Sequence, residues 1–321
     1  MPAPAIAGDY PLQIHPVDIS AYKAGNTGID YAWTFDSGRP GPHVMINAVI
    51  HGNELCGAIA VDLLFREGVR PKAGKLSLVF CNVAAYLSFD PAAPTTSRYV
   101  DEDMNRVWDT PTLDGPRQSA DLVRARQLRP LVDTVDQLLD IHSMQHATAA
   151  LSLAGMTGQG LALAKAVGVP PLIVCDKGHA AGKRLRDYGD FGIDGHSRAA
   201  LLVECGQHWE TASREIAIAS SLRFLRLFDI VDDAFLAKHT DPSPPPPAQV
   251  VQVTQAVTIA TDRFSFNQDF RGLEVIEKAG TPIGQDGDVP VVTPYDRCIL
   301  IMPSRRLTKG GTAVRLGRFV S

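Results

Sequence analysis

A run of prolines divides the chain into two parts of different character. Residues 241–247 read Asp-Pro-Ser-Pro-Pro-Pro-Pro. Because proline lacks a backbone N–H and has a fixed φ angle, such a run cannot form a helix or a central strand, and it favours the extended polyproline II conformation. We therefore expect a semi-rigid linker over residues 241–248, between a domain of residues 1–240 and a smaller one of residues 249–321.

The part before the linker alternates between strand-like and helix-like segments. Residues 43–50 form a nearly unbroken apolar run, typical of a strand that is covered on both faces. Further strands are predicted over 75–80, 137–141, 172–174 and 200–203. Apolar residues at helical spacing predict helices over 57–67, 119–131, 161–167 and 212–231. This alternation predicts an α/β domain with a largely parallel or mixed sheet.

The part after the linker contains only short strand-like segments separated by glycine and proline. These segments are residues 250–254, 257–259, 273–276, 289–292 and 299–302. Short strands bounded by turn residues are typical of a small all-β domain.

The charge balance and the cysteines exclude several classes of protein. The chain has 31 basic and 35 acidic residues, a net charge of −4, which argues against a nucleic-acid coat or a membrane-surface protein. No apolar stretch approaches the roughly 18–20 residues that a membrane span needs. The start of the chain, residues 1–7, lacks the features of a signal peptide. Five cysteines without a CxxC pair predict reduced thiols. We therefore expect a cytoplasmic protein with neither nucleic acid nor membrane as a partner.

Four residues with metal-binding or acid–base side chains stand at the ends of predicted strands. His51 follows the first strand, with Glu54 three residues later, while His142 and Glu204 each come directly after another strand. In an open α/β sheet, ligands bind outside the carboxyl ends of the strands. We therefore expect these four side chains to meet in one crevice.

Two imidazoles and one carboxylate, with a fourth position open, are the donors of a catalytic zinc site. A second carboxylate that does not bind the metal would then move protons. A lone histidine after a strand is more often an ordinary hydrogen-bonded residue, and a His-x-x-Glu pair occurs by chance. Their joint occurrence at three strand ends favours the metal site. Ligand roles are not expected for the remaining candidates His146, His179, His196 and His208.

The segment from Ser97 to Trp108 is rich in planar hydrogen-bond donors. Taken alone, it would be interpreted as an acidic loop with solvated arginines. Arg98, Asn105 and Arg106, however, match the geometry of carboxylate oxygens. Next to a zinc site, these residues would select an anionic substrate.

Four short motifs together resemble those of the succinylglutamate desuccinylase/aspartoacylase family, a branch of the zinc carboxypeptidase-like hydrolases. The order and approximate spacing of the motifs agree over about residues 40–210, and the C-terminal part is similar to the family's C-terminal domain. The resemblance implies a three-layer α/β/α domain with a mixed sheet, followed by a small all-β domain. The motifs are His51-Gly52-Asn53-Glu54, Asp101-Glu102-Asp103-Met104-Asn105-Arg106, Asp140-Ile141-His142 and Val203-Glu204-Cys205-Gly206.

The resemblance also implies roles for the residues of the crevice. It implies that His51, Glu54 and His142 bind one Zn²⁺ per subunit and that Glu204 is the general base and acid.

For the substrate, the resemblance implies binding by Arg98, Asn105 and Arg106, and Arg106 would also stabilise the oxyanion. Tyr295 is the best match to a tyrosine that the family's C-terminal domain places near the active site. The family also uses a further arginine before the catalytic glutamate, for which this chain offers Arg184, Arg186 and Arg198.

These roles predict hydrolysis of a small anionic N-acyl amino acid to a carboxylate and a free amino acid. One alternative is a zinc carboxypeptidase-type peptidase, because that branch uses the same zinc and arginine chemistry. Another is a non-catalytic ligand-binding protein with a vestigial site. The resemblance is compatible with a homo-oligomer, and the sequence leaves the acyl group and the amino acid open.

Overall fold

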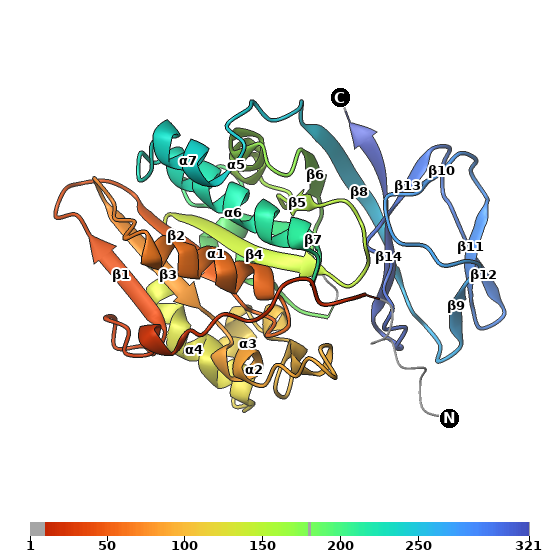
Figure 1. Cartoon of the computed structure of the whole chain (residues 1–321). Helices are drawn as coiled ribbons and strands as arrows, with labels where there is room; N and C mark the ends of the chain where they lie inside the picture. Colours follow the sequence, from red (N-terminus) through yellow and green to blue (C-terminus); the bar gives the residue numbers. More distant parts are fainter. Residues whose placement is uncertain (1–9, 179–180, 321) are drawn as a thin grey trace.

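The computed structural model describes residues 10–178 and 181–320. The residues on which the signal-peptide argument rests, and His179, therefore lie outside the described residues. The described strands form one mixed sheet of eleven strands and a smaller sheet of three (Figure 1). In spatial order the large sheet contains β1 (Ala32–Asp36), β3 (Lys75–Phe80), β2 (His43–Ala48), β4 (Gln137–Met144), β7 (Ala199–Gln207), β5 (Leu151–Leu153), β6 (Leu172–Cys175), β8 (Gln249–Thr258), β14 (Thr312–Val320), β13 (Cys298–Ile301) and β10 (Val275–Ile276).

The four strands β3, β2, β4 and β7 run parallel to one another in the middle of the larger part. β1 is antiparallel at the edge, and β5 is antiparallel to β7. Because β2, β4 and β7 are parallel, their carboxyl ends lie at the same edge of the sheet. This edge carries the residues that the sequence predicts for the site.

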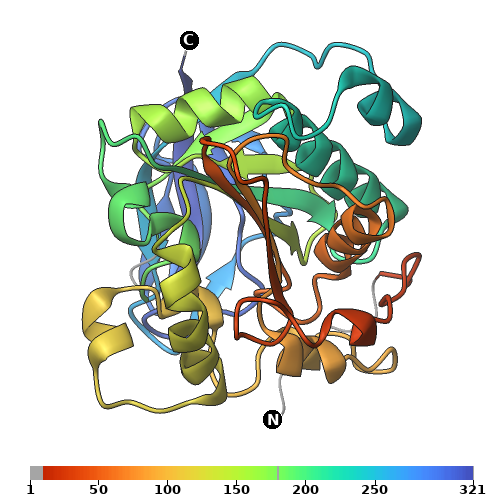
Figure 2. The same ribbon diagram turned by 90° about the vertical axis from the view of Figure 1, so that its left-hand side faces the viewer.

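Helices cover both faces of this sheet (Figure 2). α1 (Leu55–Arg66), α5 (Gly158–Val167) and α6 (Thr211–Arg226) pack on the face that presents Ile46 and Leu201. α4 (Ala120–Val132) packs on the opposite face. The other helices are α2 (Val83–Leu87), α3 (Thr110–Asp114), α7 (Asp233–His239) and the 3-10 turns η2 (Ser20–Tyr22), η3 (Thr96–Arg98), η4 (Met104–Arg106), η5 (Leu185–Asp187) and η6 (Gly189–Gly192). The predicted three-layer α/β/α architecture with a mixed sheet is confirmed.

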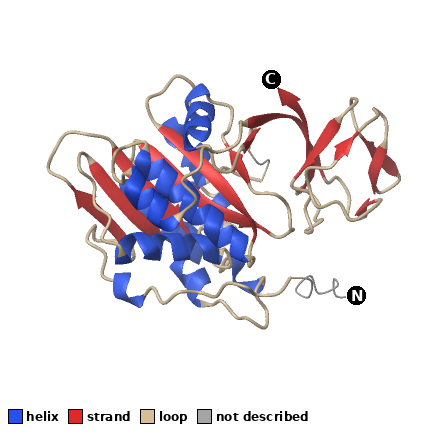
Figure 3. Ribbon diagram, turned by 45° about the horizontal axis from the view of Figure 1, so that its top comes forward, coloured by secondary structure: helices blue, strands red, loops and turns tan. Residues whose placement is uncertain are grey.

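The C-terminal part consists of strands and loops at one end of the molecule (Figure 3). The first residues of β8 pair in parallel with β6, and β14, β13 and β10 follow as further neighbours. The small sheet has the order β12 (Val289–Val292), β11 (Pro282–Asp286) and β9 (Phe264–Phe266). The C-terminal β region is confirmed, and its strands extend the central sheet. The domain bounds at 240 and 249 stay a prediction.

Several predicted elements differ from the observed ones. The helix predicted over 212–231 ends at Arg226, and the two strands predicted between 250 and 259 form the single strand β8. Strands β1, β5, β9, β11 and β14 were not predicted from the sequence. β5 has only three residues, too few to show a period, and β14 contains the buried Arg315, which interrupts its apolar pattern.

Two further observations bear on the sequence analysis. All five cysteines are unpaired and buried, as predicted. Within the described ranges, no helix has both the length and the apolar character that crossing a membrane requires.

Candidate metal centre and its pocket

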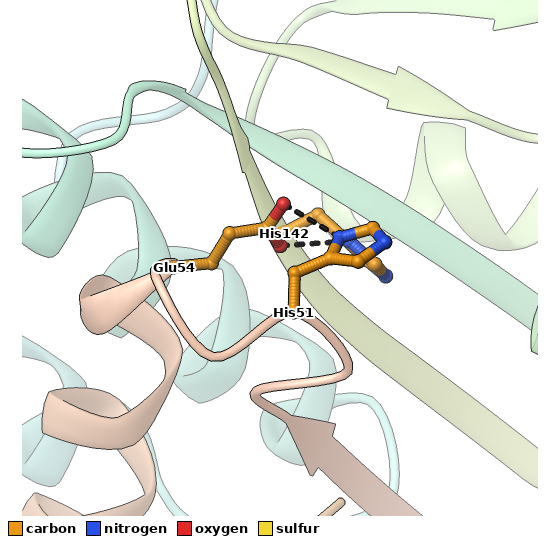
Figure 4. Close-up of side chains that lie close together, drawn as sticks. All are labelled: His51, Glu54 and His142. Carbon is orange, nitrogen blue, oxygen red and sulfur yellow. Dashed lines mark hydrogen bonds and ion pairs between the residues drawn. The ribbon is translucent and has the colours of Figure 1, made fainter. Parts of the chain in front are cut away.

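Three side chains from two regions of the chain converge at the carboxyl edge of the sheet (Figure 4). His51 lies in the turn after β2, Glu54 is the N-cap residue of α1, and His142 lies on β4. Nδ1 of His51 is 2.8 Å from Oε1 of Glu54, and Nδ1 of His142 is 2.8 Å from Oε2 of the same carboxylate. One ligand atom from each residue lies within 4.8 Å of the others. The structure therefore brings together the three residues predicted to bind a metal.

The turn that carries His51 and Glu54 requires a glycine between them. A Cβ atom on Gly52 would lie 2.2 Å from the backbone carbonyl carbon of Ala85 in the middle of α2. Only glycine permits this close approach of two backbone segments. The turn is thereby packed against α2, which fixes the direction of both side chains.

Two aspartates hold the imidazoles from the other side. Nε2 of His51 is 2.8 Å from Oδ1 of Asp103, and Nε2 of His142 is 3.0 Å from Oδ2 of Asp140. The Nδ2 amide of Asn47 donates to Asp140 at 2.7 Å. A carboxylate bound to one imidazole nitrogen fixes the ring and leaves the other nitrogen for a metal. Both histidines therefore present Nδ1 to Glu54.

Asp103 and Asp140 were not predicted to have a role of their own. Asp140 lies two residues before His142 on the same strand, so both side chains point to one face of the sheet. The spacing of two residues on one strand could therefore have identified Asp140 as a partner of His142 from the sequence. Asp103 lies in another segment, and no local spacing relates it to His51.

The donor set fits a divalent cation such as Zn²⁺. Burial opposes ionisation of Glu54, but the neighbouring imidazoles hold the pKa of its carboxyl well below the usual range. Burial likewise opposes a charge on His142, but Asp140 and Glu54 raise its pKa well above the usual value. Glu54 Oε2 has no hydrogen-bond partner among the described residues, although His142 Nδ1 is close. Two imidazoles and a buried anionic oxygen without a hydrogen bond are the donors that zinc uses in proteins.

Glu204 lies beside this cluster, as predicted. It is on β7 in register with His142 on β4, and its side chain is buried. Burial raises the pKa of Glu204 to about 8, an effect that His142 opposes and Glu54 reinforces. Its Oε2 has no hydrogen-bond partner among the described residues. A carboxyl group that titrates near neutral pH can both accept and release a proton.

A pocket of about 270 Å³ opens over the cluster. Its lining includes the metal-centre residues, Glu204, and the predicted substrate-binding residues Arg98, Asn105 and Arg106. Nη2 of Arg98 is 3.1 Å from Oδ2 of Asp103, and Nη2 of Arg106 is 3.7 Å from the same oxygen. The three substrate-binding candidates therefore lie together, beside the aspartate that holds His51.

Asn105 already makes hydrogen bonds within the protein. Its Oδ1 accepts a hydrogen bond of 2.9 Å from the backbone N–H of Leu185. The Nδ2 amide group is 3.5 Å from Nε2 of His142. Nδ2 of Asn105 is therefore the group that is available to donate a hydrogen bond to a substrate.

Of the three candidates for a further arginine, only Arg184 lines the pocket. It is buried and donates to Asp176 and Asp187. Arg186 bonds Asp187 and the carbonyl of Ala154. Arg198 donates to the carbonyls of residues 132 and 135.

The C-terminal strands add arginines that the sequence analysis did not find. Arg315 on β14 is buried, lines the pocket, and lies 3.2 Å from Oδ2 of Asp176. Arg271 and Arg306 line the pocket from loops and are exposed. No sequence pattern near these residues linked them to the metal centre, because only the folding of β14 against the larger sheet brings Arg315 there.

Tyr295 is not among the residues that line this pocket. Its hydroxyl is 2.7 Å from Oγ1 of Thr254, and the guanidinium of Arg318 lies over its ring, 4.1 Å from the centroid. The ring packs on the apolar cluster of the C-terminal strands. The structure therefore does not bring Tyr295 to the metal centre.

The loop that carries Arg98 and Asp103 is fixed by one buried carboxylate. Asp121, in the first turn of α4, accepts hydrogen bonds from the backbone N–H groups of Val100, Asp101 and Glu102 at 3.2, 2.7 and 3.0 Å. It also accepts from Nδ2 of Asn82 at 2.6 Å. Asp121 thus determines where the loop places Asp103 against His51.

We expect Asp121→Asn to weaken zinc binding about 10- to 100-fold, the usual effect of disturbing groups that support metal ligands. The new amide N–H would face the backbone N–H groups of the loop and displace Asp103. Competition with a chromogenic chelator measures the affinity. Asp109→Asn is the matched control, because that carboxylate caps α3 by accepting from Thr112 N and does not line the pocket. Equal zinc affinities in both variants would contradict the role of Asp121.

Comparison with known proteins gives a family match and a set of similar structures. A family model described as the succinylglutamate desuccinylase/aspartoacylase catalytic domain matches residues 40–224. No curated protein sequence matches the chain.

Three solved structures illustrate the similarity of the fold. The succinylglutamate desuccinylase from Vibrio cholerae is 17% identical with a TM-score of 0.66, over 90% of this chain and 86% of that chain. The succinylglutamate desuccinylase from Vibrio parahaemolyticus is 18% identical with a TM-score of 0.61, over 88% and 82%. Murine aminoacylase 3 is 17% identical with a TM-score of 0.60, over 88% and 96%. The shared fold extends over both the α/β part and the C-terminal strands.

Proposed function

Because the chain belongs to the succinylglutamate desuccinylase/aspartoacylase family of hydrolases, we propose that it uses Zn²⁺ to hydrolyse the amide bond of a small anionic N-acyl amino acid. The observation that carries this proposal is the placement of His51, Glu54 and His142 beside Glu204 in a pocket lined by arginines. The products would be a carboxylate and a free amino acid.

In this proposal, His51 and His142 through Nδ1 and Glu54 through its carboxylate would hold one zinc ion. When bound, zinc lowers the pKa of a water molecule and polarises a carbonyl oxygen. Asp103 and Asp140 keep the imidazole rings in the orientation that presents Nδ1.

Glu204 moves the protons. Its Oε2 takes a proton from the attacking water and later gives that proton to the leaving nitrogen of the amide. The register of Glu204 with His142 and its buried position support this assignment. Since the pKa of Glu204 is raised to about 8 by burial, the group is suited to both directions of transfer.

Arg98, Asn105 and Arg106 bind the substrate. Arg98 pairs with the substrate carboxylate, and Nδ2 of Asn105 donates to an oxygen of the substrate. Arg106 donates to the carbonyl oxygen as that oxygen gains negative charge. The proposal gives Tyr295 no role, because the residue does not line the pocket.

Replacing Arg106 by alanine is expected to lower kcat by about 10²- to 10³-fold, the usual cost of losing one donor to a developing oxyanion. Zinc content should not change, because Arg106 is not a ligand. Steady-state kinetics and metal analysis of the purified variant test both statements. A rise in KM with an unchanged kcat would show that Arg106 binds the substrate only.

The activity itself is tested with zinc-loaded protein and a panel of N-acetyl-aspartate, N-succinyl-glutamate and dipeptides. We expect release of free amino acid from one or more N-acyl compounds, and loss of that release when a chelator removes the metal. Hydrolysis of dipeptides alone would favour the zinc carboxypeptidase alternative.

We further propose that the protein acts in the cytoplasm. The five unpaired, buried cysteines support this location, since oxidising compartments favour disulfides.

A further inference from the structure

Strand alternation places apolar side chains directly beside the proposed base. Leu202 lies two residues before Glu204 on β7, and Met144 lies two residues after His142 on β4, so each pair shares one face of the sheet. Leu153 on β5 is the register partner of Leu202. These three residues pack in one cluster and line the pocket. We call Met144, Leu153 and Leu202 the apolar floor.

The strand order separates the apolar floor from the arginines that hold the substrate. The sheet runs β2, β4, β7, β5, and His51, which follows β2, lies on the side where Arg98 pairs with Asp103. Leu153 on β5 lies on the other side of Glu204. A substrate whose amide bond lies between His142 and Glu204 therefore has charged side chains on one side of that bond and aliphatic side chains on the other.

Residues after β13 also line the aliphatic side. Met302 and Pro303 line the same pocket, and Met302 packs against the cluster that contains the apolar floor. The aliphatic surface therefore includes residues from the larger part and from the C-terminal part.

The two buried arginines that line the pocket already have carboxylate partners. Arg184 donates to Asp176 and Asp187, and Arg315 lies 3.2 Å from Asp176. Because Arg186 also bonds Asp187, three arginines share these two aspartates, and the protein neutralises only part of their positive charge. A terminal carboxylate lying on the apolar floor would lose its hydration against aliphatic carbon, which is unfavourable.

We propose that the apolar floor binds an uncharged aliphatic acyl chain, so that the preferred substrates carry an acyl group of several carbons without a second carboxylate. This inference rests on the proposed function and specifies its acyl group. The carboxylate of the amino acid stays with Arg98, Arg106 stays at the carbonyl oxygen of the amide, and the acyl chain extends over Leu202 toward Leu153.

The first test compares N-acetyl, N-propanoyl and N-butanoyl derivatives of one acidic amino acid with zinc-loaded protein. We expect kcat/KM to rise roughly fourfold for each added methylene, as expected for burial of a CH₂ group. We also expect the 4-methylpentanoyl derivative to be a better substrate than the succinyl derivative, which has the same branching but a terminal carboxylate. A flat or falling series, or a preference for succinyl, would overturn the inference.

A matched pair of variants tests the residues. Leu202→Ala removes part of the apolar floor, whereas Leu201→Ala removes a buried leucine from the opposite face of the same strand. We expect the ratio of kcat/KM for butanoyl to acetyl to fall several-fold in Leu202→Ala and to remain unchanged in Leu201→Ala. Because the ratio is taken within one preparation, a loss of folded protein cancels. Equal ratios in both variants would contradict the inference.

Calorimetric titration with the same compounds separates this inference from the proposed reaction. Tighter binding of longer acyl chains without any hydrolysis would support the apolar floor and overturn the proposed hydrolysis. Hydrolysis of all derivatives without a dependence of binding or rate on chain length would support the reaction and overturn the apolar floor.

Discussion

Replacing Glu204 by glutamine is expected to lower kcat by about 10²- to 10⁴-fold, the range that a general acid–base residue contributes. Glutamine has nearly the same size and keeps the packing on β7, but it can neither accept nor release the proton. Zinc content should stay at the wild-type value, because His51, Glu54 and His142 are unchanged. Steady-state kinetics and metal analysis on the same preparation measure both quantities.

The control for this variant is Glu210→Gln, at the N-cap of α6 shortly after β7 and outside the pocket lining. Its kcat should match the wild type. If Glu204→Gln lost zinc together with activity, Glu204 would be a ligand and the assignment of the base would be wrong.

Replacing Glu54 by glutamine is expected to remove the stabilisation that zinc gives the folded protein. A ligand at 1,000 times its Kd stabilises the native state by about 4.1 kcal/mol. We therefore expect the wild type to melt several degrees higher with zinc than with a chelator. Glu54→Gln should show no such difference at the same zinc concentration, and its activity should be lost, because the anionic ligand between the two imidazoles is gone.

Differential scanning calorimetry with and without zinc, together with metal analysis, measures this effect. Glu67→Gln is the control, since Glu67 ends the same helix and pairs with Lys238 at the surface. A zinc-dependent shift of equal size in Glu54→Gln and in the wild type would show that the metal binds elsewhere.

The elements of the site that depend on local sequence could be predicted. His51 and Glu54 lie three residues apart around a glycine, and His142 and Glu204 lie at the ends of strongly apolar runs. Parallel strands bring their carboxyl ends to one edge of a sheet, so these four residues could be placed together without knowledge of the register. Arg98, Asn105 and Arg106 could be predicted to line the same pocket, because their segment occurs together with the other motifs of the family.

The sequence by itself thus determined the α/β class of the larger part and the candidate donors of the metal centre, because both follow from periods and spacings within short segments, whereas the three layers were implied by the family resemblance. Only the tertiary structure decided which groups support and surround that centre. Asp103 reaches His51 across 52 residues, Arg315 reaches the pocket from β14, and Tyr295 stays on the C-terminal cluster. Antiparallel β5 sets Leu153 opposite Leu202 through register alone. Such pairings depend on contacts between segments that are distant in the sequence, so they cannot be predicted from a local sequence pattern.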